Sequence, residues 1–109
     1  MKGYNKQYYR DNRAQMLIRE YTKIDKRIGK ENDLTVEWFE ENIEKQPCFY
    51  CDTIVEPRGA DRIDNSEGHT QSNVVPCCKV CNKVRNNLFT AEEMKLLGQT
   101  IKQIKFARL

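Results

Sequence analysis

The sequence predicts an α+β protein in which a short β-hairpin and a helix lie between helices at the two ends of the chain. Two observations favour this class. Apolar residues recur at helical spacing near both ends, whereas residues 47–88 are rich in turns and cysteines and lack that spacing. The 109 residues suffice for one compact domain. We expect a helical N-terminal arm (1–46), a core (47–89) and a C-terminal helix (90–109).

The N-terminal arm is predicted to contain two helices. The first spans about residues 8–28 and ends at Gly29, a typical C-terminal glycine. Its apolar stripe has spacings of four, three and four and consists of Leu17, Tyr21, Ile24 and Ile28. Thr35 is a typical N-cap for a second, short helix, which we expect to end before Pro47.

The C-terminal helix is predicted to begin after Thr90. Thr90 and Glu93 form the Thr-x-x-Glu pattern of a capping box. The apolar residues that follow at helical spacing, and that we expect to be buried, are Met94, Leu97, Ile101 and Ile104.

Charge is distributed unevenly along the chain, although the net charge is only +3. Residues 1–30 carry nine basic and three acidic side chains, residues 31–57 carry one and eight, and residues 58–109 carry nine and five. Two basic segments that flank an acidic one suit a polyanionic partner. Ordinary solvated helix faces would give the same pattern, so charge alone does not decide the partner.

Two Cys-x-x-Cys pairs are the strongest chemical signal. Cys48 and Cys51 form the first pair, and Cys78 and Cys81 form the second. This spacing lets each turn direct two sulfurs at one ion, so the pairs predict a tetrahedral, structural zinc site. Two disulfides or free thiols are the alternatives, which a reducing compartment disfavours. Cys77 is the odd cysteine, because only Cys78 has the two-residue spacing to Cys81.

The segment between the cysteine pairs is predicted to form a hairpin. We expect a strand over 61–63 and a returning strand over 73–75, joined by a polar turn and followed by a helix over 78–88. Asp61 on the strand and Asn82 on the helix would then lie near one another. Oxygen ligands of this type suit Mg²⁺ or Mn²⁺.

These residues resemble a known family. The motifs that carry the resemblance are Cys-x-x-Cys at 48–51, Asp-Arg-Ile-Asp-Asn at 61–65, Gly-His-Thr at 68–70, Asn-Val-Val-Pro at 73–76 and Cys-x-x-Cys-Asn at 78–82. Together they are similar to the HNH endonucleases, most of all to the small members found in phages and mobile elements. The resemblance implies a zinc-stapled ββα-metal core and metal-dependent hydrolysis of DNA, by nicking or double-strand cleavage.

The resemblance also implies roles for individual residues. Asp61 and Asn82 would bind a catalytic Mg²⁺ or Mn²⁺, and Asn73 would orient the catalytic loop. The four paired cysteines would hold the zinc. Asp64 falls in a turn, where a bond to the backbone is a better expectation than metal binding.

Arg62 is a departure from the family pattern, because most members have a histidine general base directly after the metal-binding aspartate. Arginine cannot act as a base at neutral pH, but Arg62 could bind the scissile phosphate. His69 is the only histidine and lies in the loop that should face the site, so it is the candidate base. Tyr50 is a poorer candidate, because packing against the zinc knuckle would explain it.

DNA is the expected partner. The basic residues in or beside the expected site that could contact phosphates are Arg58, Lys79, Lys83 and Arg85. A catalytically weak or inactive zinc-knuckle module that only binds DNA is the alternative function, and a protein-binding zinc domain is a third. The sequence does not decide DNA specificity, nor whether the protein is a monomer or a homodimer.

A cytoplasmic location is expected. The first residues lack the apolar segment of a secretory signal, and no apolar run approaches the length of about 20 residues that spans a bilayer.

Overall fold

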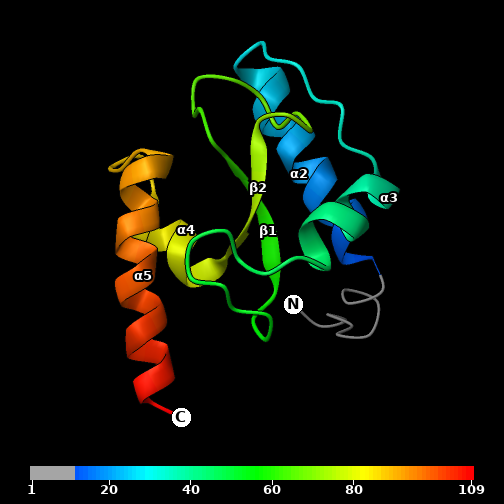
Figure 1. The fold of residues 1–109 in the computed structure, drawn as a ribbon. Helices are drawn as coiled ribbons and strands as arrows, with labels where there is room; N and C mark the ends of the chain where they lie inside the picture. Colours follow the sequence, from blue (N-terminus) through cyan, green and yellow to red (C-terminus); the bar gives the residue numbers. More distant parts are fainter. Residues whose placement is uncertain (1–11) are drawn as a thin grey trace, which may run out of the picture.

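The computed structural model of the chain describes residues 12–109 (Figure 1). A two-stranded hairpin and the helix α4 lie between the N-terminal helices on one side and α5 on the other (Figure 1). The predicted α+β class is therefore confirmed. In chain order the elements are α2 (Arg13–Arg27), α3 (Val36–Phe39), the π-helical turn η1 (Glu40–Glu44), β1 (Arg58–Arg62), β2 (Val74–Cys78), α4 (Lys79–Arg85) and α5 (Ala91–Ala107).

The hairpin is longer than the sequence predicted. β1 and β2 pair antiparallel from Arg58 opposite Cys78 to Arg62 opposite Val74. The expected first strand over 61–63 is thus only the end of β1, and Ile63 lies just beyond it. β2 continues into the second cysteine pair, so α4 begins one residue after Cys78, whose side chain caps it. The hairpin thereby connects the zinc knuckle directly to the polar loop.

The N-terminal helices follow the prediction within the described part of the chain. The predicted residues 8–11 of the first helix lie outside the described residues, and α2 begins at Arg13. Gly29 follows the end of α2 with a positive φ of 70°, which glycine adopts without strain. Thr35 accepts a hydrogen bond from the Trp38 amide, so its predicted capping role is confirmed.

The C-terminal helix α5 has the predicted capping box between Thr90 and Glu93. Met94 is fully buried, and Leu97 and Ile101 pack against the cysteine-bearing core. The predicted burial of Ile104 is wrong, because Ile104 is 46% exposed; Ile28, the last residue of the other stripe, is 44% exposed. Both residues lie at or near the C-terminal end of their helix.

Two clusters of buried residues lie on either side of the hairpin. One contains the cysteines and Tyr50 and is covered by α5. The other joins Ala60 and Val74 of the hairpin to Phe39 and Ile43, and α2 packs against it. Within the described residues, no helix has the length and apolar character that crossing a membrane requires.

Candidate active site and metal centre

The four cysteines of the two Cys-x-x-Cys pairs meet at one buried point. The Sγ atoms of Cys48, Cys51, Cys78 and Cys81 all lie within 4.8 Å of one another. Cys51 Sγ and Cys78 Sγ are 3.7 Å apart. Zn–S bonds of about 2.3 Å in a tetrahedron require a sulfur–sulfur distance of about 3.8 Å, so this cluster can hold a structural zinc ion. All five cysteines are free, which excludes the disulfide alternative in this structure.

Backbone amides support the thiolate geometry. The Cys78 amide donates to Cys48 Sγ at 3.4 Å, and the Cys81 amide donates to Cys78 Sγ at 3.5 Å. Cys77 is buried but lies outside the cluster, and its thiol donates to the Cys78 carbonyl oxygen. The cluster thus contains Cys78 and not Cys77, as the two-residue spacing to Cys81 predicted.

Lys105 of α5 places a positive charge beside the cysteine cluster. Its Nζ lies 3.5 Å from Cys51 Sγ and 3.8 Å from Cys78 Sγ, and it donates to Glu56 at 2.6 Å. Burial acts to lower the pKa of Lys105, but Glu56 and the neighbouring sulfurs raise it above its ordinary value. Four thiolates around a Zn²⁺ ion would leave two negative charges, and this lysine would offset part of them.

A groove of about 930 Å³ runs between α2, β1 and α4. Four of the predicted site residues line it together, namely Asp61, Arg62, His69 and Asn82. Lys79 and Lys83 line it as well, and both are exposed. The groove thus brings together oxygen ligands, cations and the single histidine from segments that are separate in the sequence.

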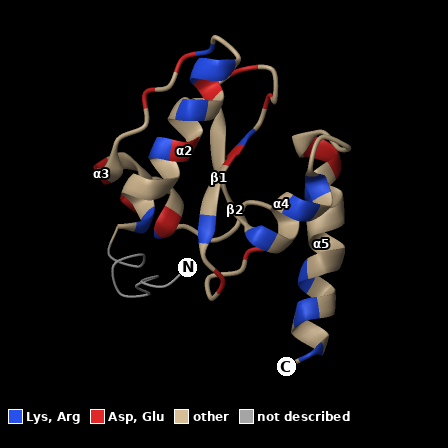
Figure 2. Cartoon of the chain, turned by 180° about the vertical axis from the view of Figure 1, so that it is seen from behind, with Lys and Arg blue, Asp and Glu red and all other residues tan. Residues whose placement is uncertain are grey.

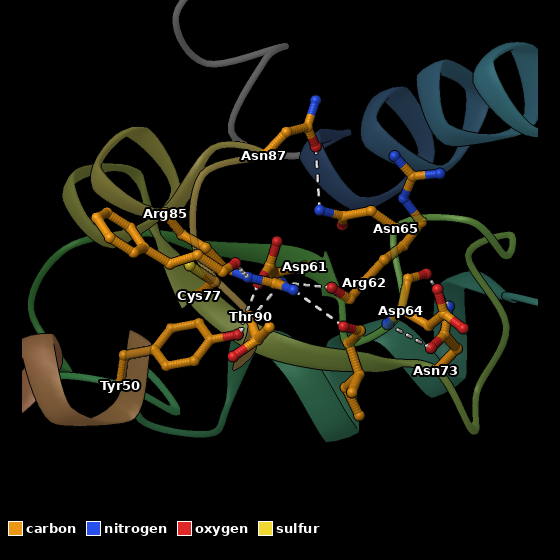
Figure 3. Close-up of polar contacts among 12 residues, drawn as sticks. Tyr50, Asp61, Arg62, Asp64, Asn65, Asn73, Cys77, Arg85, Asn87 and Thr90 are labelled. Carbon is orange, nitrogen blue, oxygen red and sulfur yellow. Dashed lines mark hydrogen bonds and ion pairs between the residues drawn. The ribbon is translucent and has the colours of Figure 1, made fainter. Parts of the chain in front are cut away.

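Two buried side chains hold the Asp61 carboxylate in place (Figure 3). Its Oδ2 accepts a hydrogen bond from Tyr50 at 2.8 Å and one from Arg85 at 2.5 Å. Burial, followed by the Asp61 carboxylate, raises the pKa of Tyr50 above its ordinary value, so its hydroxyl remains a donor. Within residues 12–109, Asp61 Oδ1 and the side chain of Asn82 make no hydrogen bond. Both are therefore available to a hard cation.

Asn73 ties the polar loop together (Figure 3). Its Oδ1 accepts from the Asp64 amide, and its Nδ2 donates to the carbonyl oxygens of Asp64 and Gly68. Asp64 Oδ1 in turn accepts from the amide and the hydroxyl of Ser66. These contacts agree with the structural role expected for Asn73 and with the turn role expected for Asp64.

His69 lies against α2, with only 4% of its surface exposed. Its Nδ1 lies 2.9 Å from Asp25 Oδ1, and its amide donates to Asp25 Oδ2. Its ring stacks on Tyr21 with 4.3 Å between the ring centroids. Asp25 lies in none of the sequence motifs, and Tyr21 was expected only in the apolar stripe of the first helix. The available signal was an acidic residue four positions after Tyr21, on the apolar side of a predicted helix.

Arg58 and Arg85 are both buried, and this corrects the expectation that they contact DNA phosphates. The Arg58 guanidinium donates to the carbonyl oxygens of Glu44, Gln46, Ile54 and Glu56. The Arg85 guanidinium donates to Asp61 and to the carbonyl oxygens of Arg62, Ile63 and Phe89. These carbonyls lie at the ends of β1 and η1 or in the segments between elements, and the two arginines donate to them.

Comparisons with known proteins identify the fold. No protein-family model matches the chain. Over 70 residues, or 62% of its length, the chain is 36% identical to an uncharacterised protein, R423, of Acanthamoeba polyphaga mimivirus. The match spans 13% of the length of that viral protein.

A solved structure is similar over nearly the whole chain. The rare-cutting HNH restriction endonuclease PacI matches with a TM-score of 0.71 and 24% sequence identity, over 87% of this chain and 80% of that chain. The hairpin, α4 and the four-cysteine cluster are the parts that the sequence resemblance implied. The chain thus has the fold of an HNH endonuclease, with a four-cysteine cluster that could hold a structural zinc.

Proposed function

We propose that the chain is a metal-dependent endonuclease that hydrolyses DNA phosphodiester bonds. One observation carries the proposal: Asp61 from β1 and Asn82 from α4 line the same groove, and each has a side-chain oxygen that accepts no hydrogen bond from a described residue. A carboxylate and an amide oxygen fit Mg²⁺ or Mn²⁺. The fold shared with an HNH restriction endonuclease supports DNA as the substrate.

The residues around the groove supply the remaining chemistry. A bound Mg²⁺ or Mn²⁺ would polarise the phosphate and stabilise the departing 3′ oxygen. Arg62 uses one N–H to bond the Glu67 carbonyl, which leaves its other donors for the phosphate oxygens. His69 accepts a proton from the attacking water. The water oxygen bonds to phosphorus, the P–O3′ bond breaks, and O3′ takes a proton from solvent, so that the products carry a 5′ phosphate and a 3′ hydroxyl.

The exposed lysines of α4 suit the approach of a DNA backbone. Lys79 and Lys83 lie on the groove side of the short helix, beside the proposed metal ligands. Figure 2 shows Lys and Arg bands on α4 and on α2, the two helices that border the groove. Contacts of this kind supply affinity without reading the base sequence.

Nicking of supercoiled plasmid DNA across a series of Mg²⁺ and Mn²⁺ concentrations tests the proposal. Asp61→Asn removes the proposed ligand charge, and we expect it to reduce nicking by at least about 100-fold. Asp52→Asn is the matched control, because Asp52 is exposed, pairs with Lys102 and does not line the groove. Zinc content and thermal unfolding establish that both variants are folded. Equal nicking by Asp61→Asn and the wild type would reject catalysis and leave the DNA-binding module as the alternative.

A further inference from the structure

Asp25 and His69 form a buried pair that the sequence motifs do not contain. Asp25 lies near the end of α2 and is 1% exposed, although it is ionisable. A carboxylate is rarely buried without strong partners, because desolvation is costly. Its partners here are the ring and amide of His69 and the side chain of Asn32, which donates to Oδ2 at 2.7 Å. The arrangement is therefore built around the histidine.

The contacts of Asp25 determine which ring nitrogen of His69 carries the proton. Oδ1 faces Nδ1 at 2.9 Å, and a carboxylate can only accept, so Nδ1 carries the hydrogen. Burial acts to raise the pKa of Asp25, but the bonds from His69 and Asn32 lower it below its ordinary value. The carboxylate is thus ionised at neutral pH, and Nε2 of a neutral ring is left as an acceptor.

Nε2 of His69 opens on the groove. Within residues 12–109, every fully buried side-chain nitrogen or oxygen atom has a hydrogen-bond partner. Nε2 of His69 has no partner among these residues, so this atom is not fully buried. Nε2 is therefore reached by solvent, and His69 lines the groove that also holds Asp61 and Asn82. An acceptor nitrogen at this place can take a proton from a water molecule in the groove.

The surroundings hold the ring in one orientation. Tyr21 stacks on one face at an interplanar angle of 15°. Gly68 allows the loop to lie this close to the end of α2, since a Cβ there would be 1.9 Å from the Glu31 carbonyl oxygen and 3.3 Å from Asp25 Cγ. A ring held by packing, by a side-chain bond and by its own amide has little freedom to turn.

We propose that Asp25 is a positioning residue that fixes His69 in the Nδ1–H tautomer, with Nε2 free to act as the general base of the nuclease. The proposal rests on the proposed function and assigns to α2, outside the motif segment, a part in the reaction. In this proposal His69 takes the role of the histidine that directly follows the metal-binding aspartate in most of the family. Arg62 occupies that position here. The proton passes from the attacking water to Nε2 and later to solvent.

Several charged or titratable groups influence the ionisation of His69. Tyr21 and Asp25 face it from α2, and Asp61 and Arg62 face it from β1. Burial is the main cause that lowers the pKa of His69 below its ordinary value, and Asp25 opposes part of this effect. His69 is therefore neutral at pH 7, as a base must be.

Nitrogen-15 NMR of the imidazole tests the tautomer without DNA or activity. Because His69 is the only histidine, its two ring nitrogens are assigned without ambiguity. We expect a protonated Nδ1 and an unprotonated Nε2 in the wild type at neutral pH. In Asp25→Asn the amide oxygen keeps the bonds from Asn32 and the His69 backbone, so the amide N–H₂ faces Nδ1 and the proton moves to Nε2. An Nε2–H ring in the wild-type protein would overturn the proposal.

Nicking rates then test the role in catalysis. We expect Asp25→Asn and His69→Gln each to lose about 10²–10⁴-fold in rate, the usual contribution of a general base. Asp33→Asn is the matched control, because Asp33 holds the same loop through the Gln71 amide at 2.7 Å but does not touch the ring. The acid limb of the wild-type pH–rate profile should have the midpoint found for His69 by NMR.

The two levels of failure are separable. If Asp25→Asn has full zinc content and nicks DNA at the wild-type rate, the positioning role is overturned. Nicking by the wild type in the same experiment would still support the nuclease. Wild-type protein that does not nick DNA would overturn the nuclease and the base role together, with the tautomer still measured in the same sample.

Discussion

Asp61 and Arg85 form a buried ion pair in which Oδ2 of the carboxylate lies 2.5 Å from Nη1 of the guanidinium. The pair joins the hairpin to the last residue of α4. Because Arg85 and Tyr50 both bind Oδ2, the other carboxylate oxygen is directed away from them and remains open. One contact therefore both connects the two elements of the core and orients a proposed metal ligand.

Loss of Arg85 should destabilise the fold strongly. The Arg85→Met substitution leaves the Asp61 carboxylate with no cation and only Tyr50 as a donor, and it removes the guanidinium that donates to three backbone carbonyls. We expect the free energy of unfolding to fall by about 3–5 kcal/mol, as for other broken buried pairs. Denaturant unfolding with zinc in excess measures it, and Lys83→Met is the control, because Lys83 is an exposed residue of the same helix. A loss no larger than that of Lys83→Met would contradict the structural role.

Removing both Asp61 and Arg85 should lower the free energy of unfolding by less than the sum of the two single losses. Arg85→Met combined with Asp61→Asn no longer leaves a buried charge unpaired, so part of the lost stability should return. A double variant whose loss equals the sum of the two single losses would mean that the two side chains do not interact. The same denaturant experiment provides all four values of the cycle.

Lys105 should increase the affinity of the cysteine cluster for zinc. The Lys105→Met substitution keeps the apolar stem but removes the cation beside Cys51 and Cys78. We expect zinc affinity to fall about 10–100-fold, the usual effect of losing a neighbour of the metal ligands. Competition with a colorimetric chelator measures it. Lys102→Met is the control, because Lys102 lies on the same helix but pairs with Asp52 on the surface; equal affinities in the two variants would contradict the role.

The zinc site and the hairpin were predictable from sequence because their signals are local. The Cys-x-x-Cys spacing, the Thr90 capping box and the turn at Asp64 each depend on residues within a few positions of one another. The hydrogen-bond partners of Arg58 and Arg85 were not predictable in this way. A basic side chain looks the same in a sequence whether it contacts phosphate or satisfies distant backbone carbonyls, and only the fold decides between these two roles.

The same limit explains why the partner of His69 was missed. Asp25 and His69 are 44 positions apart and meet only when α2 packs across the polar loop. An acidic residue on the apolar side of a helix indicates a buried partner but does not name it. Asp61 and Asn82, by contrast, were expected on neighbouring elements because the hairpin and α4 follow one another in the chain, and both line the groove.

Acid should destabilise the protein through His69. Burial lowers the pKa of His69, so the unfolded chain takes up a proton at higher pH than the folded one. The stability contributed by neutral His69 is therefore complete above about pH 6.5 and is lost as the pH falls below it. His69→Gln removes this dependence, so its stability deficit relative to the wild type should shrink between about pH 7.5 and about pH 5.5. Denaturant unfolding measures it; a deficit that grows on acidification would show the opposite shift.

The salt dependence of DNA binding should reveal which cations face the DNA. Each phosphate contact contributes about 0.9 to the slope of log affinity against log salt concentration, so the double variant Lys79→Gln/Lys83→Gln should lower the slope by about two. The control is Lys95→Gln/Lys102→Gln on α5, where Lys95 lies over the Phe49 ring and neither residue lines the groove. Fluorescence anisotropy with a labelled duplex, at several salt concentrations and without divalent ions, gives the slopes. A larger change in the α5 control would move the DNA-binding face from the groove to the opposite side of the hairpin, and the proposed metal ligands would then have no substrate beside them.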